Sequence, residues 1–285
     1  MTALPGALPH AWGVVAADLG VPASWTRTTH LFDVVTSTND VASALASAGA
    51  PEGTMVVAGE QTAGRGRRGR SWSSPSAGGV YFSVVLRPGA RAEGPDTETM
   101  LWTLMAAVAV ADGIERASGL RPDIKWPNDL GVARPATAAE GAGWRKLAGI
   151  LAEGVVTGGT VQHVVLGVGI NVARANRDVR GPATSIEEET GVVVSPARLW
   201  ACCAASLARR RGQLTAEGPS PVLDAWRARA PSSVGSRVSW RGESGPRTGW
   251  TAGIDDTGAL RVESLGEIVT FVGGELSWED LGRDG

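Results

Sequence analysis

Four arginines and three glycines alternate in one short segment, residues 64–70, which reads Gly-Arg-Gly-Arg-Arg-Gly-Arg and is followed by Ser71 and Trp72. Arginine presents a planar fork of donors that matches phosphate or carboxylate oxygens, and glycine lets backbone N–H groups approach the same oxygens. Four like charges so close together repel one another, so we expect the empty segment to be mobile and to become ordered around an anion. The spacing predicts an anion clamp, and we name residues 64–70 the Arg loop.

Lysine is rare in this chain. Of its 27 basic residues only Lys125 and Lys146 are lysines. An ammonium is a compact, titratable point charge on a flexible stem, which a guanidinium is not. The two lysines begin the motifs Lys125-Trp-Pro-Asn-Asp129 and Lys146-Leu-Ala-Gly-Ile-Leu151. This setting favours a chemical role for both, against the plainer interpretation of two surface lysines.

Other patterns that carry chemistry are weaker. Residues 64–69 match the Gly-x-Gly-x-x-Gly dinucleotide fingerprint, but Ser71-Trp-Ser-Ser-Pro75 follows where a helix is needed. The three histidines have neither metal nor catalytic-triad spacing. Cys202 and Cys203 are adjacent, with no Cys-x-x-Cys spacing, and are interpreted as small buried hydrophobic residues. Spacing therefore predicts no metal ligand set.

Composition describes an ordinary globular protein. The chain has 285 residues, 43% of them hydrophobic, and a formal net charge of −2. The Arg loop is thus a local feature of a near-neutral body, and general polyanion binding is not implied. No apolar run is long enough for a membrane span, and residues 1–20 lack the pattern of a signal peptide. We expect a cytoplasmic protein with no membrane partner.

Periodicity and capping residues predict the helices. The first 30 or so residues are weakly periodic, which is typical of a lead-in with at most one short helix. Later helices are expected where Ser, Thr or Pro opens an apolar period. They cover residues 37–49, 97–118, 185–190, 195–211 and 220–230.

Strands are predicted by short runs of β-branched and apolar residues. They cover residues 54–59, 80–86, 123–130, 146–156 and 161–172. The last run is so apolar that we expect a central strand covered on both faces. Residues 132–143 are too rich in Pro, Ala and Gly to be core. After a break at residues 231–235, alternating strands predict a small β-barrel of about fifty residues.

Five motifs occur together in one order. They are Ser37-Thr-Asn39, Gln61-x-x-Gly-Arg-Gly-Arg-Arg-Gly-Arg-x-Trp72, the two lysine motifs, and Gly167-Val-Gly-Ile-Asn171. This set resembles biotin protein ligase, also called biotin–[acetyl-CoA-carboxylase] ligase, and residues 253–276 look like the C-terminal domain of that family. The resemblance implies an α/β (α+β) fold. Its parts would be a class II aminoacyl-tRNA-synthetase-like catalytic domain, with a mixed sheet flanked by helices, and a small SH3-like C-terminal β-barrel.

The resemblance implies a two-step, ATP-dependent reaction. Biotin and MgATP would give biotinyl-5′-AMP and pyrophosphate, and a lysine of a carrier domain would then take the acyl group. Biotin and ATP are the expected substrates, and Mg²⁺ is carried with ATP without assigned protein ligands. The implied partner is the biotin carboxyl carrier domain of acetyl-CoA or acyl-CoA carboxylase, or of pyruvate carboxylase.

Three residues match catalytic positions of the family. A carboxylate and an α-phosphate repel each other, and cationic donors offset that repulsion. Lys146 matches the lysine that bridges the two groups, and Arg67 matches a loop arginine near the mixed anhydride. Asp129 is the candidate to deprotonate the incoming lysine.

The resemblance also assigns binding positions. Those for biotin are Ser37, Thr38, Asn39, Gln61, Arg65, Gly66, Arg67, Lys146, Gly149 and Leu151, with Ile150 beside them. Those for ATP and the adenylate are Arg65, Arg67, Arg70, Trp72, Lys125, Asn128, Lys146 and Asn171. Residues 37–39 could also be interpreted as a helix cap alone, and Trp126 as a residue of the hydrophobic core.

We expect three parts: a lead-in over residues 1–30, the catalytic domain over 31–231 and the SH3-like domain over 232–285. The roughly thirty-six residues before Ser37 are too few for the DNA-binding domain of bifunctional members, so no DNA partner is expected. Two features depart from the family. Residues 132–143 are longer than its usual turn, and Glu275-Leu-Ser-Trp-Glu279 lacks a basic residue that would reach the nucleotide.

Two alternatives stay open. A lipoate–protein ligase or related acyl transferase shares the catalytic fold but not the Arg loop. A non-enzymatic nucleotide- or RNA-binding module built on the Arg loop would bind RNA in a salt-sensitive way and turn over no ATP.

Overall fold

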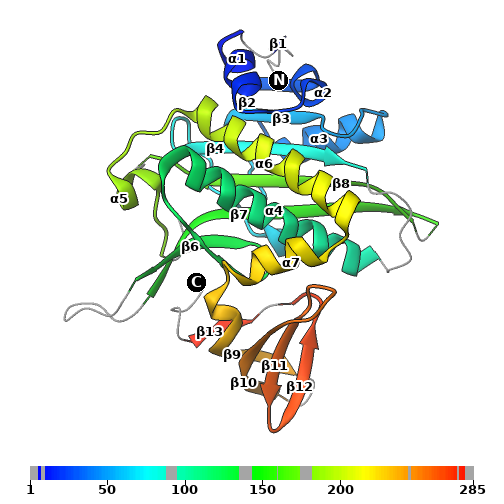
Figure 1. Ribbon diagram of the computed structural model, residues 1–285, viewed down its shortest axis with the longest axis vertical. Helices are drawn as coiled ribbons and strands as arrows, with labels where there is room; N and C mark the ends of the chain where they lie inside the picture. The colour runs from blue at the N-terminus through cyan, green and yellow to red at the C-terminus, as the bar shows by residue number, and fades with distance from the viewer. Residues whose placement is uncertain are drawn as a thin grey trace.

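A mixed eight-stranded sheet forms the centre of the computed structural model (Figure 1). The structure describes residues 6–7, 10–87, 95–134, 143–158, 160–173, 182–242, 245–274 and 276–279. The strands of this sheet are β1 (Gly6–Ala7), β2 (Thr29–Val35), β3 (Met55–Gln61), β4 (Gly79–Leu86), β5 (Asp123–Lys125), β6 (Asp129–Arg134), β7 (Gly143–Thr157) and β8 (Thr160–Asn171). Their order is β1-β2-β3-β4-β8-β7-β6-β5, in which β2 and β3 are parallel and the other neighbours antiparallel.

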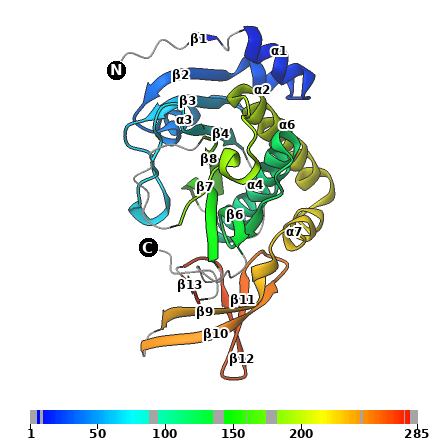
Figure 2. The same cartoon turned by 90° about the vertical axis from the view of Figure 1, so that its left-hand side faces the viewer.

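Helices cover both faces of this sheet. They are α1 (His10–Asp18), α2 (Ala23–Arg27), α3 (Thr38–Ser47), α4 (Pro95–Ser118), α5 (Ile186–Thr190), α6 (Pro196–Glu217) and α7 (Ser220–Arg227). The long helices α4 and α6 lie side by side on one face, and α3 lies on the other (Figure 2). The α3 helix buries Ala42 and Ala46 against Val56, Val85 and Val165 of the sheet. Strand β8 is therefore covered on both faces, as its apolar sequence predicts.

A second, antiparallel sheet follows in the chain. It contains β9 (Val234–Gly242), β10 (Gly245–Ile254), β11 (Leu260–Ser264), β12 (Glu267–Phe271) and β13 (Ser277–Trp278), in the order β12-β11-β10-β9-β13. The turn before β11 contacts the part of the chain that forms the first sheet, because Trp126 Nε1 donates to the Gly258 carbonyl at 3.1 Å. Gly258 has φ +87°, and a Cβ there would lie 2.6 Å from Leu104 Cδ1 of α4. Trp126 is thus a buried contact between the two sheets.

Several expectations are confirmed. The helices predicted at residues 37–49, 97–118 and 185–190 are α3, α4 and α5, and α6 extends six residues beyond the predicted end at 211. Cys202 and Cys203 are buried, and burial raises the pKa of both thiols. None of the described helices is long and apolar enough to span a membrane.

The N-terminal prediction of at most one short helix is wrong. Residues 10–27 form α1 and α2, and the next strand, β2, was not foreseen. The α1 helix packs on α6, where the rings of Trp12 and Trp200 are 5.5 Å apart. This contact joins distant parts of the chain, so the local period does not reveal it.

The single strand predicted over residues 123–130 is also wrong. The segment is a tight hairpin in which Lys125 of β5 pairs with Asp129 of β6. Pro127 lies in the turn, where a residue without an N–H does not interrupt a ladder. The predicted loop over 132–143 is shorter, because β6 runs to Arg134 and β7 begins at Gly143. Residues 135–142 lie outside the described residues.

Candidate active site

The three predicted catalytic residues lie together where β6, β7 and the Arg loop meet. Lys146 Nζ is 2.7 Å from Asp129 Oδ1. Arg67 reaches the same place from the loop, where its Nη1 donates to Asn128 Oδ1 at 3.0 Å. Burial lowers the pKa of the Arg67 guanidinium, and the negative charge of Asp129 opposes this change. Two cations thus converge near one carboxylate.

A β-bulge in β7 places the Lys146 side chain beside Asp129. The pairing of β6 with β7 skips one residue between Leu130 and Gly131, which puts Leu147 out of register. As a result Lys146 and Gly149 share a face, and a Cβ on Gly149 would lie 3.3 Å from Lys146 Cε. The bulge could not be deduced from the residue types.

Two glycines form a floor beneath Trp72. Gly149 of β7 and Gly169 of β8 are directly paired across the sheet. Added Cβ atoms would lie 2.9 Å from Trp72 Cζ3 and 2.4 Å from its Nε1, respectively. Lys146 Nζ lies 5.4 Å from the centre of the same ring. The indole can rest on the sheet because neither glycine has a side chain.

A cluster of buried polar side chains, which we call the polar cluster, lies at the start of α3. Gln61 Oε1 accepts a hydrogen bond from the Thr38 N–H at 2.8 Å, and Gln61 Nε2 donates to Ser74 Oγ at 2.8 Å. Ser37 stands at the N-cap position, but its side chain makes no capping hydrogen bond. Gln61 therefore caps the helix in its place, which leaves the Ser37 hydroxyl out of helix capping.

Ser83 completes the polar cluster, and the sequence analysis did not include it among the candidate site residues. Its Oγ is fully buried and lies 2.6 Å from Asn39 Oδ1 and 2.8 Å from Thr38 Oγ1. Gly167, opposite Ser83 on β8, leaves room for Asn39, since a Cβ there would lie 2.1 Å from Asn39 Oδ1. The sequence signal that could have identified Ser83 is its position as the lone serine within the apolar run of β4. Thr38, Asn39, Gln61 and Ser83 together give a compact set of donors and acceptors.

Arg65 differs from its expected setting. Its guanidinium forms ion pairs with Asp40 of α3 and Glu153 of β7. These contacts, led by the hydrogen bond to Asp40, raise the pKa of Arg65. The prediction that the Arg loop needs an external anion is therefore wrong for Arg65, whose anions belong to the chain itself. Asp40 and Glu153 were not among the predicted site residues.

The remaining predicted residues lie around this centre. Lys125 is buried on β5, directly across from Asp129, with its Nζ 4.6 Å from the Trp144 ring centre. Asn171 Nδ2 donates to the carbonyls of Thr184 at 3.0 Å and Lys146 at 3.4 Å. Asn171 therefore holds the Lys146 strand against residues 182–185.

The rest of the predicted set lies on the loop and on β7. The Gly66 N–H donates to the Arg70 carbonyl at 2.7 Å and folds the Arg loop back on itself, with Arg70 exposed at its end. The Leu151 carbonyl lies 3.5 Å from Asn39 Nδ2. Ile150 points away from the site into the main core, because it belongs to the buried cluster beneath the helices.

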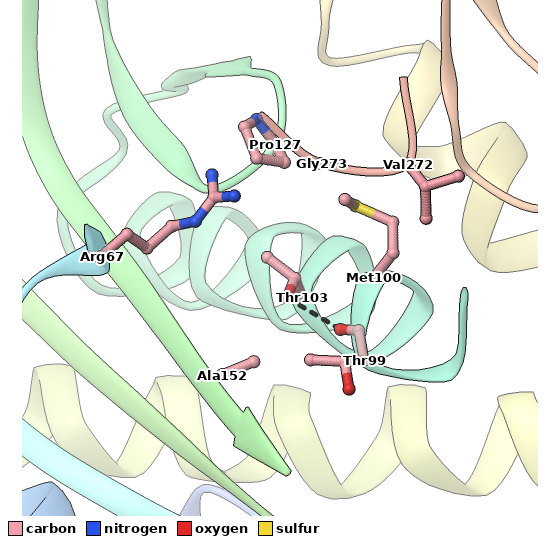
Figure 3. A pocket seen from close by; sticks show the side chains of 8 residues that line it. All are labelled: Arg67, Thr99, Met100, Thr103, Pro127, Ala152, Val272 and Gly273. Atoms are coloured by element: carbon pink, nitrogen blue, oxygen red, sulfur yellow. Dashed lines mark hydrogen bonds between the residues drawn. The ribbon is translucent and has the colours of Figure 1, made fainter. Parts of the chain in front are cut away.

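A cavity of about 340 Å³ opens beside Arg67 (Figure 3). Arg67 extends across it toward Pro127. The other lining residues are Thr99, Met100, Thr103, Ala152, Val272 and Gly273. Because Val272 and Gly273 follow β12, both sheets border this cavity. The part of the chain that the structure describes contains no group of three or more His, Cys, Asp or Glu side chains able to hold a metal ion.

Known proteins share this sequence pattern. Residues 31–171 match the model described as the Biotin/lipoate A/B protein ligase family. The chain is 36% identical over 236 residues to the bifunctional ligase/repressor BirA of Bacillus spizizenii, across 81% of this chain and 68% of that protein. It is 37% identical over 231 residues to the biotin–[acetyl-CoA-carboxylase] ligase of Paracoccus denitrificans, across 79% of this chain and 89% of that one.

Known structures share the fold. The biotin protein ligase from Aquifex aeolicus in complex with biotin and ATP superposes with a TM-score of 0.71, at 24% identity, over 88% of this chain and 97% of that one. This likeness confirms the expected α/β architecture with a second, smaller sheet. The fold and the sequence matches define a class of protein ligases. The chain belongs to the Biotin/lipoate A/B protein ligase family.

Proposed function

We propose that this protein is a biotin–[acetyl-CoA-carboxylase] ligase, which activates biotin as biotinyl-5′-AMP and transfers it to a lysine of a biotin carboxyl carrier domain. The observation that carries the proposal is the grouping of Lys146, Asp129 and Arg67, together with the glycine floor and the polar cluster at the start of α3. Membership of the family and 37% identity to a curated biotin ligase support the choice of biotin.

Lys146 serves the first step. The biotin carboxylate attacks the α-phosphorus of ATP, a P–O bond forms, and pyrophosphate leaves. Lys146 Nζ, paired with Asp129 in the empty site, exchanges this partner for the oxygens of the two reacting anions. Arg67 adds a second, partly desolvated cation over the same place, where it stabilises the charge that develops.

Asp129 serves the second step. Once Lys146 contacts the adenylate, the Asp129 carboxylate can accept a proton from the carrier lysine. The neutral amine attacks the biotinyl carbonyl, a C–N bond forms, and AMP leaves as the C–O bond to phosphate breaks. The cavity beside Arg67 is the route we propose for that lysine, since its Met100, Pro127 and Val272 walls suit an aliphatic stem.

The polar cluster at the start of α3 has donors and acceptors that suit the ureido ring of biotin. That ring is a compact donor–acceptor group at the end of an apolar molecule, so its site needs a few polar side chains and apolar walls. We assign it to Ser37, Thr38 and Gln61 at the start of α3. Asn39 supports this polar cluster, because both ends of its amide already contact Ser83 and Glu153.

The nucleotide is assigned to the other side of Lys146. Trp72 offers a flat ring and an indole N–H that is buried without a partner among the described residues. Asn128, Lys125, Arg70 and Asn171 surround it as predicted ATP positions. We propose that Mg²⁺ arrives with the ATP phosphates, with Asp129 as the acidic residue of this cluster.

We propose residues 31–231 as the catalytic domain and 232–285 as the smaller one. The separate sheet after residue 234 supports that division, although β1 and α1 attach the lead-in to the larger part. The carrier domain, of acetyl-CoA carboxylase or of pyruvate carboxylase, is the proposed macromolecular partner, and we propose no DNA partner. We place the reaction in the cytoplasm, where ATP is supplied.

The test is transfer of labelled biotin from ATP-containing mixtures to a purified biotin carboxyl carrier domain. We expect biotin-dependent pyrophosphate release and a labelled carrier, with lipoate inactive in the same assay. Release with lipoate but not biotin would indicate the acyl-transferase alternative. Tight, salt-sensitive RNA binding without ATP turnover would indicate the non-enzymatic module.

Replacing Gly169 with alanine is expected to lower kcat/KM for biotinyl-AMP formation at least about tenfold. The new Cβ would lie 2.4 Å from Trp72 Nε1 and would lift the indole from its floor. Pyrophosphate release measures the effect. Gly212→Ala on α6 is the matched control, since its Cβ would meet nothing within 4 Å. Equal rates for Gly169→Ala and wild type would show that packing of Trp72 on Gly169 does not affect biotinyl-AMP formation.

A further inference from the structure

The hydrogen bonds of the polar cluster run in one direction, which is set by Glu153 of β7. One oxygen of this carboxylate pairs with Arg65, and the other, Oε2, lies 2.8 Å from Asn39 Nδ2. A carboxylate only accepts hydrogen bonds, so Asn39 must present its amino group to Glu153 and its carbonyl oxygen to Ser83. Asn39 is 3% exposed, and its Oδ1 lies 2.6 Å from Ser83 Oγ. The charge of Glu153 therefore fixes the orientation of this buried amide.

Ser83 fixes the Thr38 hydroxyl in turn. An amide oxygen only accepts, so the single hydrogen of the Ser83 hydroxyl is donated to Asn39. Ser83 Oγ also lies 2.8 Å from Thr38 Oγ1, and toward Thr38 it can only accept, because its hydrogen is already used. The Thr38 hydroxyl must then donate to Ser83. What remains at Thr38 Oγ1 is the capacity to accept.

Gln61 provides a second acceptor beside Thr38. The Thr38 backbone N–H can only donate, and it lies 2.8 Å from Gln61 Oε1, which orients this amide as well. The other end of the amide, Nε2, donates to Ser74 Oγ. Gln61 Oε1 lies 3.1 Å from Thr38 Oγ1, farther than Ser83 does. Two oxygens with lone pairs to offer therefore lie side by side, an arrangement that favours a ligand with an N–H group.

We propose that Ser83 and Glu153 are positioning residues that determine substrate selection. They hold the Thr38 hydroxyl as a hydrogen-bond acceptor, so the site takes a ring N–H and rejects a ring oxygen at the same place. This selection is built into the folded chain, and no contact has to change when the substrate binds. The inference rests on the proposed function, which places the ureido ring of biotin against Thr38 and Gln61.

The test compares biotin with two analogues, in each of which one ureido N–H is replaced by oxygen. Pyrophosphate release at saturating ATP gives kcat/KM for each compound, and the poorer analogue identifies the N–H that faces Thr38. We expect the wild type to prefer biotin to this analogue by about a hundredfold or more, because the analogue would set oxygen against oxygen in a buried place. A general loss of activity cancels from this ratio of two kcat/KM values.

Ser83→Ala is expected to reduce the ratio to about tenfold or less, although activity with biotin itself falls. Without the Ser83 oxygen, the Thr38 hydroxyl can turn and donate to the analogue, while Gln61 keeps the Thr38 backbone N–H. Ser74→Ala is the matched control. It removes a hydroxyl from the other side of the polar cluster and leaves Thr38 donating to Ser83, so the wild-type ratio should persist.

Glu153→Gln tests the origin of the direction with a side chain of the same shape. A glutamine amide can donate as well as accept, so Asn39 can turn and present its amino group to Ser83. Ser83 can then donate to Thr38, and Thr38 to the analogue. We expect a ratio of about tenfold or less for this variant too.

Asp40→Asn is the matched control for Glu153→Gln. It also removes an ion pair of Arg65, but it leaves Asn39 oriented by Glu153, so the wild-type ratio should persist. A wild type that uses both analogues as well as biotin would overturn the inference, and so would an unchanged ratio in either test variant. Glu153→Gln decides the question if Ser83→Ala fails to fold. Absence of biotin adenylation by the wild type would instead contradict the proposed function.

Discussion

Lys146→Arg is expected to lower the rate of biotinyl-AMP formation at least about a hundredfold, although the charge is kept. Lys146 Nζ lies 2.7 Å from Asp129 and 5.4 Å from the Trp72 ring, in a narrow space above the glycine floor. An ammonium can stand as a point charge between two oxyanions. A planar guanidinium is wider, and here it would meet the indole on one side and Gly149 on the other.

Biotin-dependent pyrophosphate release under single-turnover conditions measures this loss. Lys146→Met provides the comparison, because it keeps a similar stem without any charge; we expect the two variants to be impaired to a similar degree. Thermal unfolding midpoints close to the wild-type value would show that both variants fold. Adenylation by Lys146→Arg within tenfold of wild type would refute the bridging role of Lys146.

The main elements of the fold could be predicted because their signals are local. Ser195 and Pro196 open α6, and Gly119 follows α4 with φ +77°. The errors occur where a contact between residues far apart in the sequence determines the local secondary structure. The α1 helix depends on the packing of Trp12 on Trp200, and the β5–β6 hairpin depends on pairing with β7. The presence of Pro127 nevertheless indicates that residues 123–130 are not one continuous strand.

The candidate site could be predicted in part because motifs mark it. Lys146, Asp129 and Arg67 were expected together, and they lie together. Ser83 and Glu153 were missed because neither belongs to a recognisable motif: Ser83 is the lone serine of β4, and Glu153 follows the lysine motif of β7. Their importance follows from the register of β4, β7 and β8, which places them beside α3. Residue types alone do not determine that register.

Arg67→Gly is expected to speed release of biotinyl-AMP by roughly ten- to a hundredfold. The substitution removes the partly buried guanidinium that contacts Asn128 at 3.0 Å and lies near Asp129. Such a charge-assisted contact contributes about 1.5–3 kcal/mol, and glycine adds backbone freedom that opposes closure of the Arg loop. Stopped-flow dissociation of preformed biotinyl-AMP measures the rate.

Arg68→Gly is the matched control for this variant. Arg68 already has φ +57°, a left-handed conformation that glycine adopts without strain. The change removes one loop arginine and adds the same backbone freedom, but it leaves the contact between Arg67 and Asn128 in place. Release from Arg68→Gly should therefore stay within about threefold of wild type.

Faster release has a chemical consequence, because free biotinyl-AMP is a reactive mixed anhydride that acylates exposed amines. In a mixture with serum albumin, Arg67→Gly should label the albumin, whereas the wild type retains its adenylate and labels it weakly. Labelling of the ligase itself should stay low, since its two lysines are Lys125, which is 3% exposed, and Lys146 within the site. If Arg67→Gly neither releases adenylate faster nor labels albumin more than wild type, the Arg loop does not close over the adenylate.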